Sequence, residues 1–299
     1  MKILVTGGTG LIGTRLSAAL ATRGHQLWVY SRQPWNASKR LPGSVVVIDS
    51  FDQIPDDLSL DAVINLAGEN IAGGRWTERR KKKIFDSRIG VTEALLALVQ
   101  RLQHKPKVLI SGSAVGFYGD AGHAELTESS PAVKRDFTYL LCDAWENAAR
   151  SFSNVGIRVC ILRIGVVITH HGGFLGKLLP LYRKGLGSIL GDGNQWLSWI
   201  HLEDLIEVIV RCLDASAAEG VYNAVAPQPV NYRKFHNTLA QVCDVPALLR
   251  IPKLPLSLAL GEMSVLMLGG QKVSPARLVR EGFEFRYPDI NSALRAEVL

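Results

Sequence analysis

Residues 1–13 read MKILVTGGTGLIG, and this stretch decides the fold. An apolar run at residues 3–5 leads into a glycine-rich turn, and an amphipathic segment at residues 14–21 follows at once. This order predicts a strand, a tight turn and a helix whose positive N-terminal end can receive a pyrophosphate. Both G-x-G-x-x-G and G-x-x-G-x-x-G fit the spacing, through Gly7, Gly8, Gly10 and Gly13. A glycine motif between a strand and a helix is specific enough to predict a dinucleotide-binding site.

Short apolar strands alternate with helical patterns through the first two-thirds of the chain. We expect strands at residues 2–6, 26–30, 45–48, 62–66, 108–111 and 158–163. We expect helices at about 12–23, 78–103 and 138–153. Apolar strands separated by helices predict an α/β fold, a Rossmann-like doubly wound parallel sheet with right-handed crossovers.

The later part of the chain is punctuated by glycine and proline, with helices expected at about 203–214, 231–243 and 255–269. This change predicts a smaller C-terminal α/β lobe. We assign residues 1–170, with contributions from about 200–225, to a cofactor-binding domain, and residues 171–299 to a substrate lobe. Ligands of such sheets bind outside the carboxyl ends of the strands, so the loops there should surround one crevice.

The composition, 47% hydrophobic and 20% charged over 299 residues, is ordinary for a soluble globular protein. The net charge of +7 is scattered except at residues 79–83, RRKKK, which fall in an expected helix. We interpret that run as a solvated helix face and expect no nucleic-acid partner. The excess positive charge can still attract an anionic cofactor or substrate.

The four cysteines are far apart in the sequence and form no C-x-x-C pair. This spacing indicates small buried residues in a reducing compartment, without a metal site or a disulfide framework. The first strand begins close to Met1, and we find neither a signal peptide nor an apolar run of bilayer length. We therefore expect a cytoplasmic protein with no membrane partner.

The end of the second strand predicts which dinucleotide is bound. An NAD site usually carries an acid there for the ribose 2′-hydroxyl, whereas this chain has Ser31 and Arg32. The arginine fork and the serine hydroxyl suit a 2′-phosphate, which favours NADP (NADPH). At the end of a later strand, Ala67 and Gly68 either let the backbone approach a ligand or satisfy packing at the strand end.

At this point the residues resemble a known family. The turn TGGTGLIG at 6–13, NLAG at 65–68, SGSAV at 111–115 followed by YG, and WIHLED at 199–204 resemble the extended short-chain dehydrogenases/reductases, the NAD(P)-dependent sugar epimerases and dehydratases. More narrowly, the chain resembles an atypical, uncharacterised subgroup of epimerase family proteins. That subgroup has its own C-terminal tail, at about 248–296 here.

The resemblance implies a cofactor site. The turn from Gly7 to Gly13, with Thr9, Gly10, Leu11 and Ile12, would face the pyrophosphate, and Ser31 and Arg32 the 2′-phosphate. Leu66 and Ala67 would flank the adenosine and ribose, with Glu69 near. Arg88 would reach the cofactor or substrate from the middle of a helix. Residues Gly165 to Val167 would sit near the nicotinamide.

Catalysis is where the sequence departs from the family it resembles. The family base is the tyrosine of Y-x-x-x-K, but here Tyr139 is followed four residues later by Asp143. Residues four apart share a helix face, and a carboxylate there would raise the pKa of the phenol. Tyr139 is then either a packing residue or activated from elsewhere. Tyr118 is the other candidate base, and Ser113 is expected to bind the reacting oxygen.

Two hypotheses follow. The first is an NADP-dependent oxidoreductase or epimerase that acts by hydride transfer on a small polar substrate such as a sugar nucleotide. The second is an NADP-binding regulatory or sensor protein with little or no catalysis, which the missing lysine motivates. A homodimer is one assembly that the sequence allows.

Overall fold

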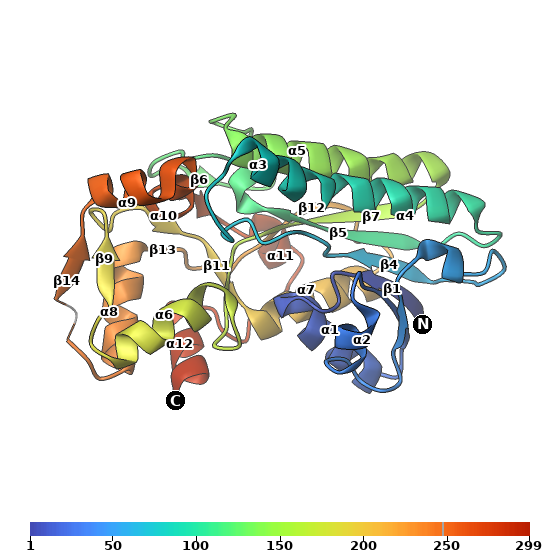
Figure 1. The fold of residues 1–299 in the computed structure, drawn as a ribbon, viewed down its shortest axis with the longest axis horizontal. Helices are drawn as coiled ribbons and strands as arrows, with labels where there is room; N and C mark the ends of the chain where they lie inside the picture. The colour runs from blue at the N-terminus through green and yellow to red at the C-terminus, as the bar shows by residue number, and fades with distance from the viewer. Residues whose placement is uncertain (247) are drawn as a thin grey trace.

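A computed structural model describes residues 1–246 and 248–299. Its centre is a seven-stranded parallel sheet in the order β12-β7-β5-β4-β1-β2-β3 (Figure 1). The strands are β1 (Lys2–Thr6), β2 (Gln26–Tyr30), β3 (Val46–Ile48), β4 (Ala62–Asn65), β5 (Val108–Ala114), β7 (Arg158–Ile164) and β12 (Gly220–Ala224). The order reverses beside β1, which places the switch point of a doubly wound sheet next to the glycine turn. The expected α/β Rossmann-like fold is confirmed.

Helices cover both faces of the sheet because alternate strand residues point to opposite sides. Ile3 and Val5 pack with α1 (Leu11–Thr22) and α7 (Leu202–Asp214), whereas Leu4 packs in a second core with α4 (Ile89–Arg101). Figure 1 shows α3, α4 and α5 on one side and α1, α2 and α7 on the other. The remaining bounds here are α2 (Pro34–Ser38), α3 (Glu78–Asp86) and α5 (Phe137–Arg150).

Short strand pairs and further helices form a smaller assembly beside the sheet. The paired strands are β8 (Val166–Ile168) with β11 (Trp199–His201), β9 (Ser188–Leu190) with β14 (Leu249–Ile251), β10 (Trp196–Leu197) with β13 (Val230–Asn231), and β6 (Glu125–Leu126) with β15 (Lys272–Val273). The helices are α6 (Gly173–Arg183), α8 (Tyr232–Val242), α9 (Lys253–Leu260), α10 (Val265–Leu268), α11 (Ala276–Arg280) and α12 (Ile290–Val298). Its own apolar core joins α6, α8 and α12.

Two expected helices are broken. The one expected at 78–103 divides into α3 and α4 at Ser87, whose hydroxyl donates back to Ile84 O of α3 and accepts from Glu69 N in the loop after β4. The one expected at 255–269 divides into α9, a 3-10 turn and α10, because Gly261 has a φ of +60°. The sequence suggested that Arg88 lies in the middle of a helix. The structure places it at the start of α4 instead.

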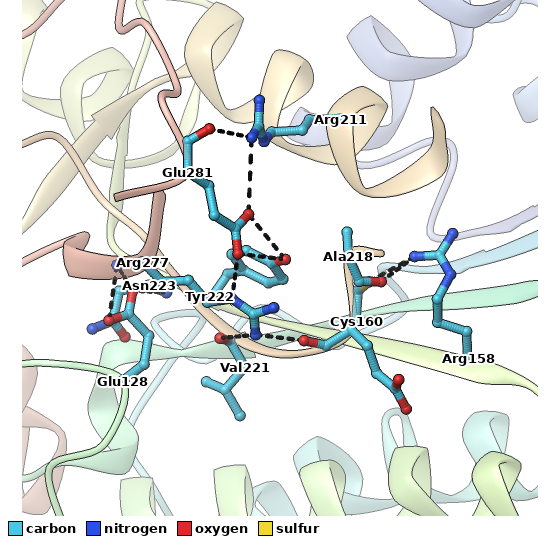
Figure 2. Close-up of polar contacts among 11 residues, drawn as sticks. Glu128, Arg158, Cys160, Arg211, Ala218, Val221, Tyr222, Asn223, Arg277 and Glu281 are labelled. Atoms are coloured by element: carbon cyan, nitrogen blue, oxygen red, sulfur yellow. Dashed lines mark hydrogen bonds and ion pairs between the residues drawn. The ribbon is translucent and has the colours of Figure 1, made fainter. Parts of the chain in front are cut away.

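Ion pairs tie the C-terminal segment to the edge of the sheet (Figure 2). Arg277 donates to Glu281 at 2.7 Å, and the Tyr222 hydroxyl on β12 donates to the same carboxylate at 3.3 Å. Arg211 of α7 lies 3.9 Å from it. Glu128 accepts from the amides of Asn223 and Arg277, each at 3.2 Å. These contacts place the C-terminal segment against β12.

Within the described ranges, no helix combines the length and the hydropathy needed to cross a bilayer.

Candidate cofactor and active site

A cavity of 470 Å³ opens at the carboxyl ends of β1, β4, β5 and β7. The first turn of α1 contributes Ile12, the loop after β4 contributes Leu66, and β5 contributes Ser113. The opposite wall comes from residues 195–198, 265–267 and 269–271. We call the end of the cavity on the central sheet the cofactor end, and the end built by the C-terminal part of the chain the tail end.

The glycine turn leaves no room for side chains. Gly7 has a φ of +71°, and a Cβ added to it would lie 2.5 Å from Leu66 C. A Cβ on Gly13 would lie 2.6 Å from Gly8 Cα. Both distances are far below van der Waals contact, so glycine is required for the turn to close against β4 and for α1 to pack on the turn.

The N-terminus of α1 is free to bind an anion. In the part of the chain that the structure describes, no side chain caps this end and its first turn carries no acid. Thr14 N bonds to Gly10 O, but the amides of Leu11, Ile12 and Gly13 find no acceptor among the described residues. Three unpaired N–H groups at a helix N-terminus fit the pyrophosphate of a dinucleotide.

A cluster of charges surrounds Glu69 at the rim of the cofactor end, and we call Arg32, Glu69, Arg80 and Lys83 the rim cluster. Arg80 donates to Glu69 at 2.8 Å, whereas Lys83 and Arg32 lie 3.5 and 3.9 Å away. The Arg32 and Lys83 side chains remain 71% and 57% exposed. Burial alone would raise the pKa of Glu69. The opposing effect of Arg80 and Lys83 is larger, so the pKa of Glu69 lies below its ordinary value.

The rim cluster changes the interpretation of residues 79–83. Arg80 of that run is largely buried against Glu69 and also donates to Asn70 O, so the run is not a purely solvated face. Ser31 lies buried beside Arg32, where its hydroxyl accepts from Gln33 N. Arg32 and Lys83, a member of the run that was expected to be a solvated face, thus approach the same carboxylate.

Arg88 lies against the cavity between Gly68 and Trp145. Its Nη1 donates to the carbonyls of Glu69 and Ile84, at 3.1 and 3.2 Å, and its guanidinium lies 5.2 Å from the Trp145 ring centroid. Its Nε and Nη2 have no acceptor among the described residues, and burial lowers the pKa of the group. Two donors are therefore left for a ligand at this end of the cavity.

Ser113 stands above a buried ion pair, and we call Ser113, Glu146, Arg150 and Arg163 the floor cluster. The Ser113 hydroxyl donates to Glu146 Oε1 at 2.8 Å. Arg163 holds both Glu146 oxygens, at 2.8 and 2.9 Å, and Arg150 approaches from the surface at 2.8 Å. Glu146 is 0% and Arg163 4% exposed. Because its proton faces Glu146, Ser113 presents oxygen lone pairs to the cavity.

The two tyrosines named from the sequence do not line the cavity. Tyr118 is fully buried, and its hydroxyl donates to Asn223 Oδ1 at 2.7 Å; burial raises its pKa, against the lowering effect of nearby Arg163. It thus belongs to the contacts of β12 and not to a crevice-facing loop. Tyr139 packs against Phe117, at 5.5 Å between centroids.

The face that α5 turns to the cavity carries Thr138, Leu141, Cys142 and Trp145. Thr138 Oγ1 donates to Asp136 at 2.6 Å, so its proton is already bonded. Burial raises the pKa of the Cys142 thiol to about 11. Ser113 and Thr138 thus both line the cavity with hydroxyls whose protons are bonded inside the protein, and of the two Ser113 is the one whose proton faces a buried carboxylate paired with an arginine.

The loop after β7 completes the cofactor end. Gly165 and Val167 line the cavity, as expected, together with Ile164 and Val166. A Cβ on Gly165 would lie 2.6 Å from Ser198 O, so the close approach of this loop to residue 198 requires glycine. Among the described residues there is no group of three or more metal-ligating side chains.

Sequence reasoning missed the ion pair of the floor cluster. Two signals were present: Glu146 lies on the otherwise apolar face of α5 with Cys142 and Ala149, and Arg163 interrupts an apolar strand. A charge in each of two apolar patterns predicts a buried pair, because a buried charge is rarely tolerated alone.

Two family models match this chain. Residues 3–224 match the model of the NAD dependent epimerase/dehydratase family, and residues 251–297 match a domain of unknown function, DUF1731. The chain is 37% identical over 295 residues to epimerase family protein YfhF of Bacillus subtilis, covering 98% of this chain and 97% of the relative. It is 34% identical over 300 residues to human epimerase family protein SDR39U1, covering 99% of each.

A solved structure matches along the whole chain as well. The crystal structure of human epimerase family protein SDR39U1 with NADPH superposes with a TM-score of 0.89 at 32% identity, covering 100% of this chain and 99% of that one. The match to the second family model begins close to the start of the tail that the sequence singled out, at about residue 248.

Proposed function

The chain belongs to the NAD dependent epimerase/dehydratase family, and on that premise we propose that it is an NADP-dependent oxidoreductase or epimerase that transfers hydride to or from a small substrate. The observation that carries the proposal is the cofactor end itself. Free amides at the N-terminus of α1 and the unpaired donors of Arg88 lie at one cavity, and the two exposed cations of the rim cluster, Arg32 and Lys83, stand near Glu69, one residue after the lining residue Gly68. The relative crystallised with NADPH supports the same cofactor.

The proposed cofactor contacts follow the sequence expectations, residue by residue. The turn at Gly7–Gly13 would hold the pyrophosphate, and Ser31 and Arg32 the 2′-phosphate. Leu66, Ala67 and Gly68 would lie along the adenosine and ribose. Bound NADP(H) supplies the hydride chemistry at its nicotinamide ring, and the protein supplies position and polarity.

We propose Ser113 as the group that meets the reacting oxygen. Its hydroxyl proton is directed to Glu146, so the Ser113 oxygen can accept a hydrogen bond from a substrate hydroxyl. A proton that leaves this hydroxyl would pass to Ser113 while the Ser113 proton moves to Glu146 Oε1. This route replaces the tyrosine and lysine of the wider family, whose lysine position carries Asp143 here. Asp143 Oδ2 is bonded to Asn147.

A second function has a specific observation in its favour. Neither Tyr118 nor Tyr139 lines the cavity, and this agrees with an NADP-binding regulatory protein that performs no chemistry. In that case cofactor binding would change the association with a partner, and Ser113→Ala would leave function intact.

One experiment tests the first proposal in two steps. Calorimetric titration of NADPH and NADH compares the unaltered protein with Gly13→Ala and with Gly43→Ala, whose added Cβ meets nothing within 4 Å. We expect NADPH to bind more tightly than NADH, and Gly13→Ala to weaken NADPH by roughly a hundredfold (about 2.7 kcal/mol). Circular dichroism of both variants checks the fold.

The second step follows deuterium from the C4 position of labelled NADPH into carbonyl compounds of several classes. Transfer that Ser113→Ala abolishes supports the enzyme. Tight NADPH binding without transfer to any class supports the regulatory alternative, and equal affinity for NADPH and NADH removes the assignment of Arg32.

The same proposal includes a division of labour within the chain: residues 1–170, with about 200–225, bind the cofactor, and residues 171–299 bind the substrate. It also includes action in the cytoplasm and assembly as a homodimer. Mass measurement by light scattering tests the last of these.

A further inference from the structure

The tail end of the cavity differs chemically from the cofactor end. Its lining is dominated by large apolar side chains, Phe174, Leu190, Leu197, Val265, Leu266 and Met267. Among the described residues that line the whole cavity, Arg88 is the one cation, and no aspartate, glutamate, lysine or histidine lines it. Arg88 itself belongs to the cofactor end, where it lies beside Gly68.

The polar groups of this wall are already engaged within the protein. The Gln195 Nε2 group donates to Leu190 O and Met267 O, at 3.1 and 2.9 Å. The Ser198 hydroxyl donates to Gln271 O at 2.6 Å and accepts from Val273 N at 2.9 Å. Groups used in this way can recognise a ligand hydroxyl only by giving up a bond, which costs free energy.

The Tyr232 and Trp196 side chains are also bonded within the protein, and the Tyr232 hydroxyl donates to Ser188 O at 3.5 Å. The Trp196 indole N–H donates to His123 at 3.2 Å. The side-chain amide of Gln271 is uncharged and has no partner in the described part of the chain. Lys272, which stacks on the Trp196 ring from outside the lining, is paired with Glu125 at 3.2 Å. Among the residues that the structure describes, no cation lines the tail end itself.

These observations exclude a good fit for a sugar nucleotide. A diphosphate placed at the tail end would meet no cation among the described lining residues, and the cost of removing an unpaired charge from water is large. The sugar hydroxyls would face leucine, valine and methionine side chains. The cavity of 470 Å³ must also hold the nicotinamide end of the cofactor, so the substrate is small.

We propose that the substrate of this site is a small, uncharged and predominantly apolar carbonyl compound or the corresponding alcohol, and not a sugar nucleotide. The inference rests on the proposed hydride-transfer function and names its substrate class. The apolar part lies on the tail end, the reacting oxygen lies at Ser113, and the Gln271 amide accommodates at most one further neutral polar group. This departs from the small polar substrate that the family resemblance suggested.

The test measures binding and turnover separately on NADPH-loaded protein. Binding is followed by tryptophan fluorescence, because Trp145 and Trp196 line the cavity. The probes are acetone, butanone and their straight-chain homologues, with UDP-glucose as the charged competitor. We expect saturable ketone binding that strengthens by about threefold to fourfold per added methylene, and no competition by UDP-glucose.

A matched pair of variants locates the probe. Leu266 lines the cavity and is 39% exposed, whereas Leu258 of α9 lies outside it and is 69% exposed, so both accept a charge without unfolding the protein. Leu266→Glu should weaken ketone binding roughly tenfold while NADPH affinity stays unchanged. Leu258→Glu should change neither.

The outcomes separate this inference from the proposed function. Ketones that bind as described but never receive hydride uphold the apolar site and overturn the enzyme. Hydride transfer to a sugar nucleotide upholds the enzyme and overturns the apolar site. Ketone binding that is absent, independent of chain length or insensitive to Leu266→Glu also overturns the inference.

Discussion

The rim cluster and the floor cluster are built from the same groups but differ in burial. In each, one glutamate is surrounded by several cations. At the rim, Arg32 and Lys83 lie 3.9 and 3.5 Å from Glu69 and stay exposed. At the floor, Arg163 holds both oxygens of a Glu146 that solvent does not reach. Breaking the buried ion pair of the floor cluster costs much free energy, so its charges stay paired. The exposed cations of the rim cluster are held weakly and can bind a ligand instead.

The comparison predicts that substitutions at the floor cost stability and that substitutions at the rim cost affinity. The strongest test is Glu146→Gln. It leaves Arg163 buried without a counter-charge, so we expect the free energy of unfolding to fall by about 3–5 kcal/mol. Urea unfolding measures the change. Arg150→Gln removes the exposed partner of the same carboxylate and should cost less than about 1 kcal/mol. Equal losses in the two variants would show that burial does not separate the clusters.

A third carboxylate, Glu297 of α12, is buried and paired like Glu146 of the floor cluster, and its contribution to stability can be tested by changing the pH. It is largely buried, 2.9 Å from His201 Nε2, and it accepts from the His170 amide at 2.7 Å. Burial raises its pKa, but the bonds from His201 and His170 prevail and lower it to about 2. A depressed pKa gives stability that is present above the ordinary value of 4.5 and is lost as the pH falls towards 2.

We therefore expect Glu297→Gln to lower the free energy of unfolding by about 3 kcal/mol at neutral pH, with NADPH affinity unchanged. The difference from the unaltered protein should shrink as the pH falls from about 4.5 to 2. Unfolding curves at several pH values measure it. A difference that stays constant with pH would mean that packing, and not charge, accounts for the loss.

At the rim, Arg32→Ala should change affinity and leave stability intact. A charged hydrogen bond to a phosphate contributes about 1.5–3 kcal/mol, so NADPH should bind roughly tenfold to a hundredfold more weakly while NADH is unaffected. Calorimetric titration of both dinucleotides measures this. Arg40→Ala, at an exposed arginine in the next segment, is the control. Equal weakening of both cofactors would place Arg32 away from the 2′-phosphate.

Lys83→Ala has the smallest expected effect. Its ammonium group is exposed and strongly hydrated, so NADPH should bind about twofold to threefold more weakly at low salt, and the difference should vanish as salt is raised. Lys82→Ala, which removes an exposed lysine already paired with Asp86, serves as the control. A loss of NADPH affinity that persists at high salt would mean that Lys83 is shielded from solvent, as the charges of the floor cluster are.

The sequence predicted the fold well because its signals were local. The glycine turn and the apolar strands each specify their own structure, and the central sheet follows from their order. The breaks at Ser87 and Gly261 were missed because a side-chain bond to a distant loop and a left-handed backbone angle leave no trace in helical periodicity.

The site was harder to predict because its contacts join distant segments. The Ser113–Glu146 bond and the Tyr118–Asn223 bond span 33 and 105 residues. Spacing along the chain could nominate Tyr118 for a crevice, but only the fold shows that its hydroxyl is bonded beneath β12. The polarity of the tail end was likewise hidden, because the bonds of Gln195 and Ser198 are made to backbone carbonyls that no motif records.

The pairing of β15 with β6 has a consequence for how the protein is made. Lys272 and Val273 pair with Glu125 and Leu126, so this contact waits until most of the chain has left the ribosome. The glycine turn and the first strands are synthesised long before, and parallel pairings of such sequence separation form slowly. A nascent chain would thus expose an apolar, half-built cavity until residues 265–273 have been synthesised and packed, so this segment covers the cavity during folding as well as forming a wall of the finished site.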